Sequence, residues 1–279
     1  MNVNMYEHIR TQENLTQLKK IGVRIIEPES GLLACGKSGI GRLAEPWEIF
    51  FEIRRALSRP DFAGKHILIT TGPTREAIDS VRFISNRSSG KMGVELAREA
   101  FRRGAKVTLV HGPAEIRVPR DVSCIPVISA AQMQEAVMKH VCECAETPDV
   151  VIMAAAVADF RPVQPTTDKI KKSGTAPQLV LEVTEDILAG LGRQRSGSRP
   201  LLIGFAVETG ELEDLLGEAR RKLEQKKVDM IVANFASDAF ELETNRVWLV
   251  DRSGKETQIA TTFKSRVASK ILDAIGRMM

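Results

Sequence analysis

The sequence predicts an α/β fold in which a mostly parallel sheet carries helices on both faces. From Lys65 onward, short apolar segments rich in β-branched residues alternate with longer segments whose apolar residues recur at helical spacing. This alternation is typical of parallel sheets, whose central strands are buried on both sides. The chain has 279 residues, of which 43% are hydrophobic, so it can bury one large core or two smaller ones.

The first 58 residues precede this alternation and are predicted to form a separate unit. We expect a helix over 12–21, a strand over 23–26, a turn over 27–31, a Gly-rich loop over 33–42 and a helix over 46–57. The sequence Ser58-Arg59-Pro60-Asp61 is typical of a linker. The predicted domains are therefore 1–59 and 60–279.

The second domain is predicted to be a Rossmann-like sheet with a C-terminal β-hairpin. Strands are expected at 66–70, 106–111, 123–127, 149–155, 201–206, 228–233 and 246–250, and helices at 89–103, 130–145, 185–193, 211–227 and 263–278. Segments 246–250 and 256–261 flank Asp251-Arg252-Ser253-Gly254, a turn sequence typical of a hairpin. Residues 160–200, rich in Pro, Lys and Gly, are predicted to form a long functional loop.

The composition argues against several classes of function. A net charge of +4 suits a phosphorylated small molecule, but with 5% aromatic residues it does not indicate nucleic-acid binding. No apolar run is long enough to predict a membrane span, and the N-terminus lacks the pattern of a signal peptide. The four cysteines lack metal-binding spacing and fit a reducing cytoplasm. No metal ligand is assigned, so Mg²⁺ is expected to arrive with phosphate groups.

The segment after the first strand is predicted to bind an anion. Gly72 turns the chain at the strand end, and Ser88-Ser89-Gly90 leads into a helix. Free backbone N–H groups and the helix dipole attract negative charge at such a helix entry, so a phosphorylated ligand is expected. Because the segment contains neither GxGxxG nor GxxxxGK[ST], an ordinary strand–helix connection is the alternative.

Further polar and aromatic residues could contact such a ligand. Asp159 follows a strand that ends in small residues, where open α/β sheets bind ligands, although it could also be a simple cap. The segment Lys169-Ile170-Lys171-Lys172 could neutralise phosphoryl charge or form a solvated patch. Phe205 could stack on a base or belong to the core. Lys222 and Lys226 share a helix face, where an anion would relieve their repulsion unless the face is simply solvated.

Together these motifs resemble one enzyme family. From about Gly64 the chain is similar to the phosphopantothenate–cysteine ligase half of the bifunctional flavoproteins of coenzyme A biosynthesis. The shared motifs, in the family's order, are GPTRE (72–76), ISNRSSGKMG (84–93), AAVADF (155–160), KIKK (169–172), GFAVET (204–209) and ARRKLEQKKVDMIVAN (219–234). The resemblance implies that CTP with Mg²⁺ activates 4′-phosphopantothenate as an acyl-cytidylate. L-cysteine then attacks, giving phosphopantothenoylcysteine, CMP and pyrophosphate. The choice of CTP over ATP comes only from the resemblance.

The resemblance also implies roles for individual residues. Asn86 would hold the activated acyl group, and Lys169 would be the catalytic lysine. The implied substrate-binding residues are Gly72, Asn86, Ser89, Gly90, Lys91 and Ala155. The implied nucleotide-binding residues are Asp159, Lys169, Glu185, Asp186, Ile187, Leu188, Phe205, Lys222 and Lys226. Glu185 departs from the proline that is common at its position.

Residues 1–58 resemble the end of the family's other half, a flavodoxin-like, FMN-dependent decarboxylase. Asn2 matches its substrate-binding asparagine and Cys35 matches the cysteine that protonates the enethiol intermediate, whereas Lys37 replaces the usual aspartate. The family's preceding flavin-binding region and catalytic histidine are absent. We therefore expect an inactive remnant of a truncation, a late-called start or a decayed fusion, and FMN only if a separate decarboxylase chain supplies the flavin-binding half.

Three functions remain open from the sequence. The first is the CTP-dependent ligase with an idle N-terminal remnant. The second is a non-catalytic regulatory module that binds nucleotide, and the third is a decarboxylase and ligase completed by a partner chain. A homodimer is also expected, because the exposed edge of the late hairpin favours pairing and the family's ligases are dimeric. The expected location is the cytoplasm, with no nucleic-acid or membrane partner.

Overall fold

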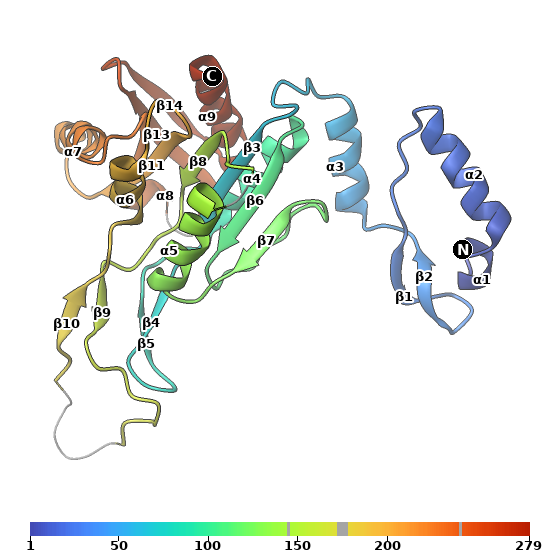
Figure 1. Cartoon of the computed structure of the whole chain (residues 1–279), viewed down its shortest axis with the longest axis horizontal. Coiled ribbons are helices and arrows are strands. Elements are labelled where there is room, and N and C mark those ends of the chain that lie inside the picture. The colour runs from blue at the N-terminus through green and yellow to red at the C-terminus, as the bar shows by residue number, and fades with distance from the viewer. Residues whose placement is uncertain (144–145, 172–177, 240–241) are drawn as a thin grey trace. The chain divides into compact units, whose positions relative to one another are not determined.

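The computed structural model describes residues 1–143, 146–171, 178–239 and 242–279 (Figure 1). These residues divide into two compact units, Met1–Arg59 and Pro60–Met279. The end of the helix expected over 130–145 and the last residue of the 169–172 motif lie outside the described residues.

The N-terminal unit is built around a small hairpin. It contains α1 (Val3–Tyr6), α2 (Ile9–Lys20), the antiparallel strands β1 (Glu29–Leu32) and β2 (Ser38–Arg42), and α3 (Pro46–Ala56). The helices expected over 12–21 and 46–57 are present. Gly36, at a left-handed φ of 78°, turns the chain and donates from its N–H to the Leu33 carbonyl at 2.9 Å.

Two expectations for this unit were wrong. Residues 23–26 belong to no strand, and the turn and Gly-rich loop expected over 27–42 form β1 and β2 instead. The reason is that a strand needs a paired neighbour, which a four-residue apolar run does not provide by itself. A tight glycine turn can pair two weakly patterned segments because it brings their backbones into register.

The second unit has a single long sheet at its centre, with the order β14-β13-β12-β11-β8-β3-β6-β7. Its parallel strands are β3 (His66–Thr71), β6 (Lys106–His111), β7 (Ser123–Pro126), β8 (Val150–Met153), β11 (Leu201–Glu208) and β12 (Met230–Phe235). The antiparallel hairpin β13 (Thr244–Asp251) and β14 (Glu256–Phe263) extends one edge. The predicted Rossmann-like sheet with its C-terminal hairpin is thus confirmed.

Helices cover both faces of this sheet (Figure 1). On one face, α5 (Ala130–Met138), α6 (Ile187–Gln194) and α7 (Leu212–Gln225) join an apolar cluster with strand residues such as Leu68, Val151 and Ile231. On the other, α4 (Lys91–Arg102) and α9 (Lys264–Met278) pack against each other. Alternate residues of the central strands therefore enter two different cores, which is why these strands read as continuous apolar runs.

Short elements complete the second unit. A π-helical turn, η1 (Lys139–Glu143), extends α5, and α8 (Ala236–Ala239) follows β12. The sequence prediction missed the antiparallel pairs β4 (Arg75–Ala77) with β5 (Phe83–Ser85), and β9 (Phe160–Pro162) with β10 (Leu181–Val183). The segment expected as a loop over 160–200 therefore begins as a two-stranded arm, because three-residue strands are too short to show a periodic pattern. In the part of the chain described here, no helix is both long and apolar enough to cross a bilayer.

Candidate functional site

The strand order creates a crevice at one edge of the sheet. In chain order, the parallel strands lie as third, second, first, fourth, fifth and sixth, so the order reverses between β3 and β8. The loops after these two strands are joined, since the Ala156 N–H donates to the Gly72 carbonyl at 2.9 Å. Ligands of open α/β sheets bind at such a switch point, outside the carboxyl ends of the strands.

A cavity of about 720 Å³ lies at this edge. Its walls come from the loop into α4 and its first turn, the loop after β8, the entry to α6, and residues of β11, α7, β12, β13 and α9. Most of the predicted site residues line it: Asn86, Ser89, Gly90, Lys91, Ala155, Asp159, Glu185, Asp186, Ile187, Leu188, Phe205, Lys222 and Lys226.

The N-terminus of α4 is fixed tightly against β3. Gly90 caps the helix at a φ of 72°, and its carbonyl accepts a hydrogen bond from Thr71 Oγ1 at 2.7 Å. A Cβ at Gly90 would lie 3.2 Å from the Gly72 nitrogen, so Gly72 supports the helix entry without lining the cavity. One turn into α4, Gly93 lies directly on the Thr71 side chain. Close backbone packing therefore fixes the first turn of α4 in the wall of the cavity, where the N-terminus of a helix favours an anion.

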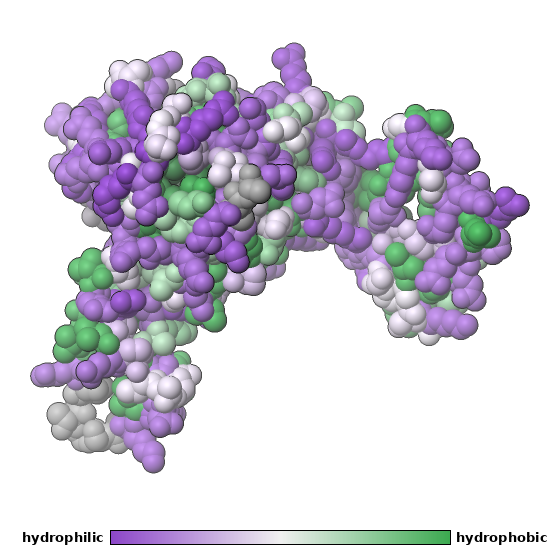
Figure 2. Space-filling model, viewed as in Figure 1, coloured by the Kyte–Doolittle hydropathy of each residue, from purple (hydrophilic) through white to green (hydrophobic). Residues whose placement is uncertain are grey.

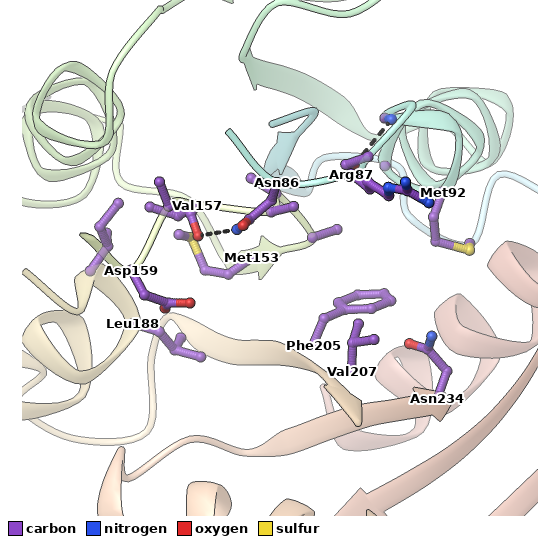
Figure 3. Close-up of a pocket in the computed structure, with 18 of the residues that line it drawn as sticks. Asn86, Arg87, Met92, Met153, Val157, Asp159, Leu188, Phe205, Val207 and Asn234 are labelled. Atoms are coloured by element: carbon purple, nitrogen blue, oxygen red, sulfur yellow. Dashed lines mark hydrogen bonds between the residues drawn. The ribbon is translucent and has the colours of Figure 1, made fainter. Parts of the chain in front are cut away.

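Asn86 is held in place from the opposite loop. Its Nδ2 donates to the Val157 carbonyl at 2.8 Å, across the mouth of the crevice (Figure 3). The backbone on that side is fixed as well, because the Ala158 N–H donates to Thr74 Oγ1 at 2.9 Å and Thr184 Oγ1 donates to the Ala158 carbonyl at 2.6 Å. These hydrogen bonds hold the carboxamide of Asn86 in a fixed position in the cavity wall.

Charged side chains gather where α6 and α7 face the cavity. Lys226 Nζ lies 2.8 Å from Asp186 Oδ2, and Lys222 Nζ lies 3.0 Å from Glu208 and 3.3 Å from Glu218. The repulsion expected between the two lysines is thus relieved here by carboxylates. Burial opposes ionisation of Asp186, but hydrogen bonds from Lys226 and the α6 backbone outweigh it and lower its pKa.

Phe205 lies in the wall of the cavity. Its ring lies between Asp159 and Leu188 on one side and Met92 and Asn234 on the other (Figure 3). Phe205 is half-buried, as a ring that forms a cavity wall would be. It is therefore available to a ligand and does not belong wholly to the core.

Lys169, the lysine that the family resemblance implies to be catalytic, lies outside this cavity. Lys169 is exposed, beyond β9 in the arm, and does not line the cavity. The next residue, Ile170, is anchored through its N–H to Asp79 Oδ2 at 3.2 Å, and its carbonyl accepts from Arg82 at 3.3 Å. Among the described residues, no group of three or more His, Cys, Asp or Glu side chains is arranged to hold a metal ion.

The two predicted decarboxylase residues meet within the N-terminal unit. Asn2 Nδ2 lies 3.3 Å from Cys35 Sγ, and both residues are at least partly exposed. A hydrogen bond from the Lys37 backbone lowers the pKa of the Cys35 thiol, and the Asn2 amide adds to the effect. This pairing places an ionisable thiol beside an amide, 33 residues apart in the chain.

Sequence reasoning assigned no role to several polar residues of the cavity wall, among them Asn234, Asn245 and Lys264. All three are buried. Asn234 lies near the end of the apolar strand β12 and is the last residue of the 219–234 motif, a signal that could have been used. Asn245 and Lys264 reach the site because β13 runs antiparallel to β12, which brings the start of β13 and the end of β14 to the edge where the parallel strands end.

Comparison with known proteins decides the family. The model for the DNA/pantothenate metabolism flavoprotein C-terminal domain matches residues 62–278, and the Flavoprotein model matches residues 1–58. The coenzyme A biosynthesis bifunctional protein CoaBC of Mycobacterium tuberculosis is 43% identical over 99% of this chain and 68% of its own length. The chain belongs to the CoaBC family.

Other CoaBC proteins agree in sequence and structure. The protein from Bacillus subtilis is 40% identical over 100% of this chain and 68% of its own length. A crystal structure of a CoaBC C-terminal domain is 41% identical, covers 78% of this chain and 97% of its own, and has a TM-score of 0.66. The cavity described above therefore lies in the region that corresponds to the CoaBC C-terminal domain.

Proposed function

We propose that the second unit is a phosphopantothenate–cysteine ligase that uses CTP and Mg²⁺. The observation that carries this proposal is a single cavity at the switch point of the sheet that combines the N-terminus of α4, Asn86 and the lysine pair of α7. An acid–amine ligation with a nucleoside triphosphate needs these features together: a site for phosphate, a donor beside the carboxylate, and cations beside the leaving pyrophosphate.

The proposed reaction has two steps. A carboxylate oxygen of 4′-phosphopantothenate attacks the α-phosphorus of CTP, the bond to the β-phosphate breaks, and pyrophosphate leaves. The amine of L-cysteine then attacks the acyl carbon, CMP departs with the electrons of the acyl–oxygen bond, and the amine loses a proton. The acyl-cytidylate divides one difficult condensation into two displacements, and the enzyme mainly has to align the reactants.

The described side chains can be given roles in these steps. The Asn86 amide holds the acyl oxygen, and Asp159 with residues 185–188 holds the nucleoside. Lys222 and Lys226 exchange their present carboxylate partners for the triphosphate, because a polyanion competes well with single carboxylates for an ammonium. Mg²⁺ bound to the phosphates of the nucleotide would supply further charge neutralisation beside Lys222 and Lys226. Lys169 does not line the cavity, so its assignment rests on the family resemblance; in that role the arm would bring its ammonium to the phosphates, where it would stabilise the charge that develops in transfer.

The decisive experiment is pyrophosphate release by the purified chain with Mg²⁺, 4′-phosphopantothenate and L-cysteine. Release that needs 4′-phosphopantothenate and prefers CTP to ATP is expected. If a folded protein binds CTP but releases no pyrophosphate with either nucleotide, the ligase proposal fails and a nucleotide-binding regulatory module takes its place.

Lys169→Gln tests the catalytic assignment. We expect kcat to fall by about 10²–10³-fold, as when one charge-stabilising donor is lost, while CTP binding stays within twofold. Lys171→Gln is the matched control, since both lysines are exposed on the same segment. Equal activity of Lys169→Gln and wild type would show that Lys169 is not catalytic.

A homodimer is the proposed assembly. Large apolar side chains are exposed along the arm that β9 and β10 form, among them Phe160, Val180 and Val183 (Figure 2). The strand β14 is also the edge of the sheet, which leaves its outer backbone groups open to pairing. We place this assembly in the cytoplasm. Light scattering at micromolar concentration should give twice the chain mass, and a monomer would refute the dimer.

A second candidate function has its own observation, the contact between Asn2 and Cys35. This pair would serve an FMN-dependent decarboxylase if another chain supplied the flavin-binding half. Copurification with such a chain and a yellow complex that absorbs in the flavin band would support this function. A colourless complex that binds no FMN would count against it.

A further inference from the structure

The end of α7 has an unusual backbone conformation. Lys227 has a φ of 53°, and among the described residues it is the only one other than glycine in the left-handed region. Its N–H donates to the Glu224 carbonyl at 3.2 Å, and the next N–H, of Val228, donates to the Leu223 carbonyl at 3.2 Å. These two bonds form a Schellman motif, in which the left-handed position is usually a glycine because a side chain makes it costly.

Two arginines hold this strained turn. The Lys227 carbonyl accepts hydrogen bonds from Arg195 Nη2 and Arg252 Nη2, both at 2.8 Å. Arg252 also donates to the Val228 carbonyl at 2.8 Å. Asp229 fixes both guanidinium groups, since it forms a buried ion pair with Arg195 and lies 3.0 Å from Arg252. Strained backbone persists where the surrounding structure determines it this firmly, and such strain is often found at functional sites.

The helix α6 is attached to the same turn at several points. At its start, Asp186 accepts from the Ala189 N–H at 2.9 Å and pairs with Lys226 at 2.8 Å. In its middle, a Cβ at Gly192 would overlap the Lys226 carbonyl, so the helix and the turn are in direct backbone contact. At its end, the C-cap residue Arg195 reaches the turn. The entry to α6 and the end of α7 are therefore held in one fixed arrangement.

Lys226 is the point at which this arrangement reaches the cavity. It directly precedes Lys227, and its side chain lines the cavity together with Asp186. Because Lys226 and Lys227 share a peptide group, the hydrogen bonds to the Lys227 carbonyl and the left-handed φ fix the backbone from which the Lys226 side chain starts. If Lys227 relaxed to a more favourable conformation, the end of α7 and the ammonium of Lys226 would both move.

We propose that Arg195 and Arg252 are positioning residues that fix Lys226 for the phosphate groups of the nucleotide. This inference rests on the proposed function and adds two residues that are not part of the cavity wall. They act through the Lys227 carbonyl, because two charge-assisted hydrogen bonds hold the left-handed turn. Lys226 is thus preorganised, and less conformational entropy is lost when the nucleotide binds.

The test is calorimetric binding of CTP and 4′-phosphopantothenate to the full chain, without turnover. Arg252 is the residue to change first, since its side chain is 45% accessible whereas that of Arg195 is buried. We expect Arg252→Gln to weaken CTP binding by about 3- to 10-fold and to change 4′-phosphopantothenate binding by less than about twofold. Arg220→Gln is the matched control and should bind both like wild type, because Arg220 also joins α7 to the hairpin, through Glu256 at 2.6 Å, but from the middle of the helix.

Two double variants distinguish positioning from a general loss of stability. In a Lys226→Gln background, Arg252→Gln should weaken CTP binding by less than about twofold more, because the side chain that it positions is gone. In an Arg252→Gln background, Lys227→Gly should return CTP binding to within about twofold of wild type, because glycine adopts the left-handed turn without strain. A merely structural role of Arg252 would lower Tm and leave the affinity for CTP unchanged.

Unchanged CTP binding by Arg252→Gln, equal weakening of both ligands, or full additivity with Lys226→Gln would overturn the inference, as would a wild-type chain that binds no CTP. If Arg252→Gln does not fold, Arg252→Lys must show the same selective loss, since it keeps the charge beside Asp229 but lacks the planar fork. Pyrophosphate release separates the two proposals. A wild-type chain without release but with the selective loss in Arg252→Gln would refute only the ligase, whereas release without that loss would refute only the role of the arginines.

Discussion

The contact between α4 and β3 gives the sharpest test of how backbone packing positions the proposed site. Gly93 sits where α4 crosses the end of β3, and a Cβ at this position would collide with the Thr71 side chain and approach the Thr70 carbonyl to 3.1 Å. Thr71 also holds Gly90, the cap of the helix. Gly93→Ala must therefore move the helix N-terminus or the strand end.

The size of that movement follows from contact distances. Non-bonded heavy atoms pack best at about 3.5–4.0 Å, so relief of the collision requires a displacement of roughly 1 Å. A displacement of about 1 Å in a catalytic site can reduce the rate by roughly 100-fold. Overpacking costs about 1–3 kcal/mol of folding free energy, which corresponds to roughly 2–12 °C in Tm for a domain of this size.

The assay compares kcat/KM for pyrophosphate release with Tm from calorimetry. We expect Gly93→Ala to lose about 100-fold in kcat/KM while remaining folded at 25 °C. Gly217→Ala in α7 is the control, because no heavy atom lies within 4 Å of its added Cβ. That variant should keep its activity and gain up to about 1 kcal/mol of stability. A Gly93→Ala enzyme with wild-type kcat/KM would refute the view that this contact sets the geometry of the site.

Two further predictions concern ionisable groups. Cys35 should be alkylated by iodoacetamide before Cys124, because backbone and Asn2 hydrogen bonds lower the pKa of Cys35 whereas burial raises that of Cys124. Asn2→Ala should slow the Cys35 reaction roughly two- to fivefold by peptide mass spectrometry, and an unchanged rate would show that the contact does not form in solution. A hydrogen bond from Arg221 lowers the pKa of Glu218 from 4.5 to about 2, so the stability it provides is present above pH 4.5 and is lost as the pH falls towards 2. Glu218→Gln should therefore lower Tm by roughly 1–4 °C at pH 7 and by clearly less near pH 2, whereas an equal difference at both pH values would contradict this origin.

The apolar pattern within single segments was enough to predict most strands and helices of the second unit. It failed for short strands, which form only because a partner strand pairs with them. The strands β3, β6, β8, β11 and β12 could be recognised because each is mostly buried and carries an apolar run. The pairs β4–β5 and β9–β10 were missed because strands of three residues carry no period. In the N-terminal unit, residues 23–26 are strand-forming types without a strand, whereas Gly39 and Gly41 lie in one. A tight turn and pairing with β1 determine that β2 forms, and the intrinsic strand propensity of its residues does not.

The candidate site divides in the same way. The sequence by itself determined that polar and glycine-rich motifs follow the apolar strands, so Asn86, Asp159 and Phe205 could be named as candidates from their motifs alone. Only the tertiary structure decided that these residues share one cavity with Asn245 and Lys264. The physical reason is that strand order and the direction of the β13–β14 hairpin arise from packing between distant segments. A buried lysine such as Lys264 looks like any surface lysine until the elements around it are in place.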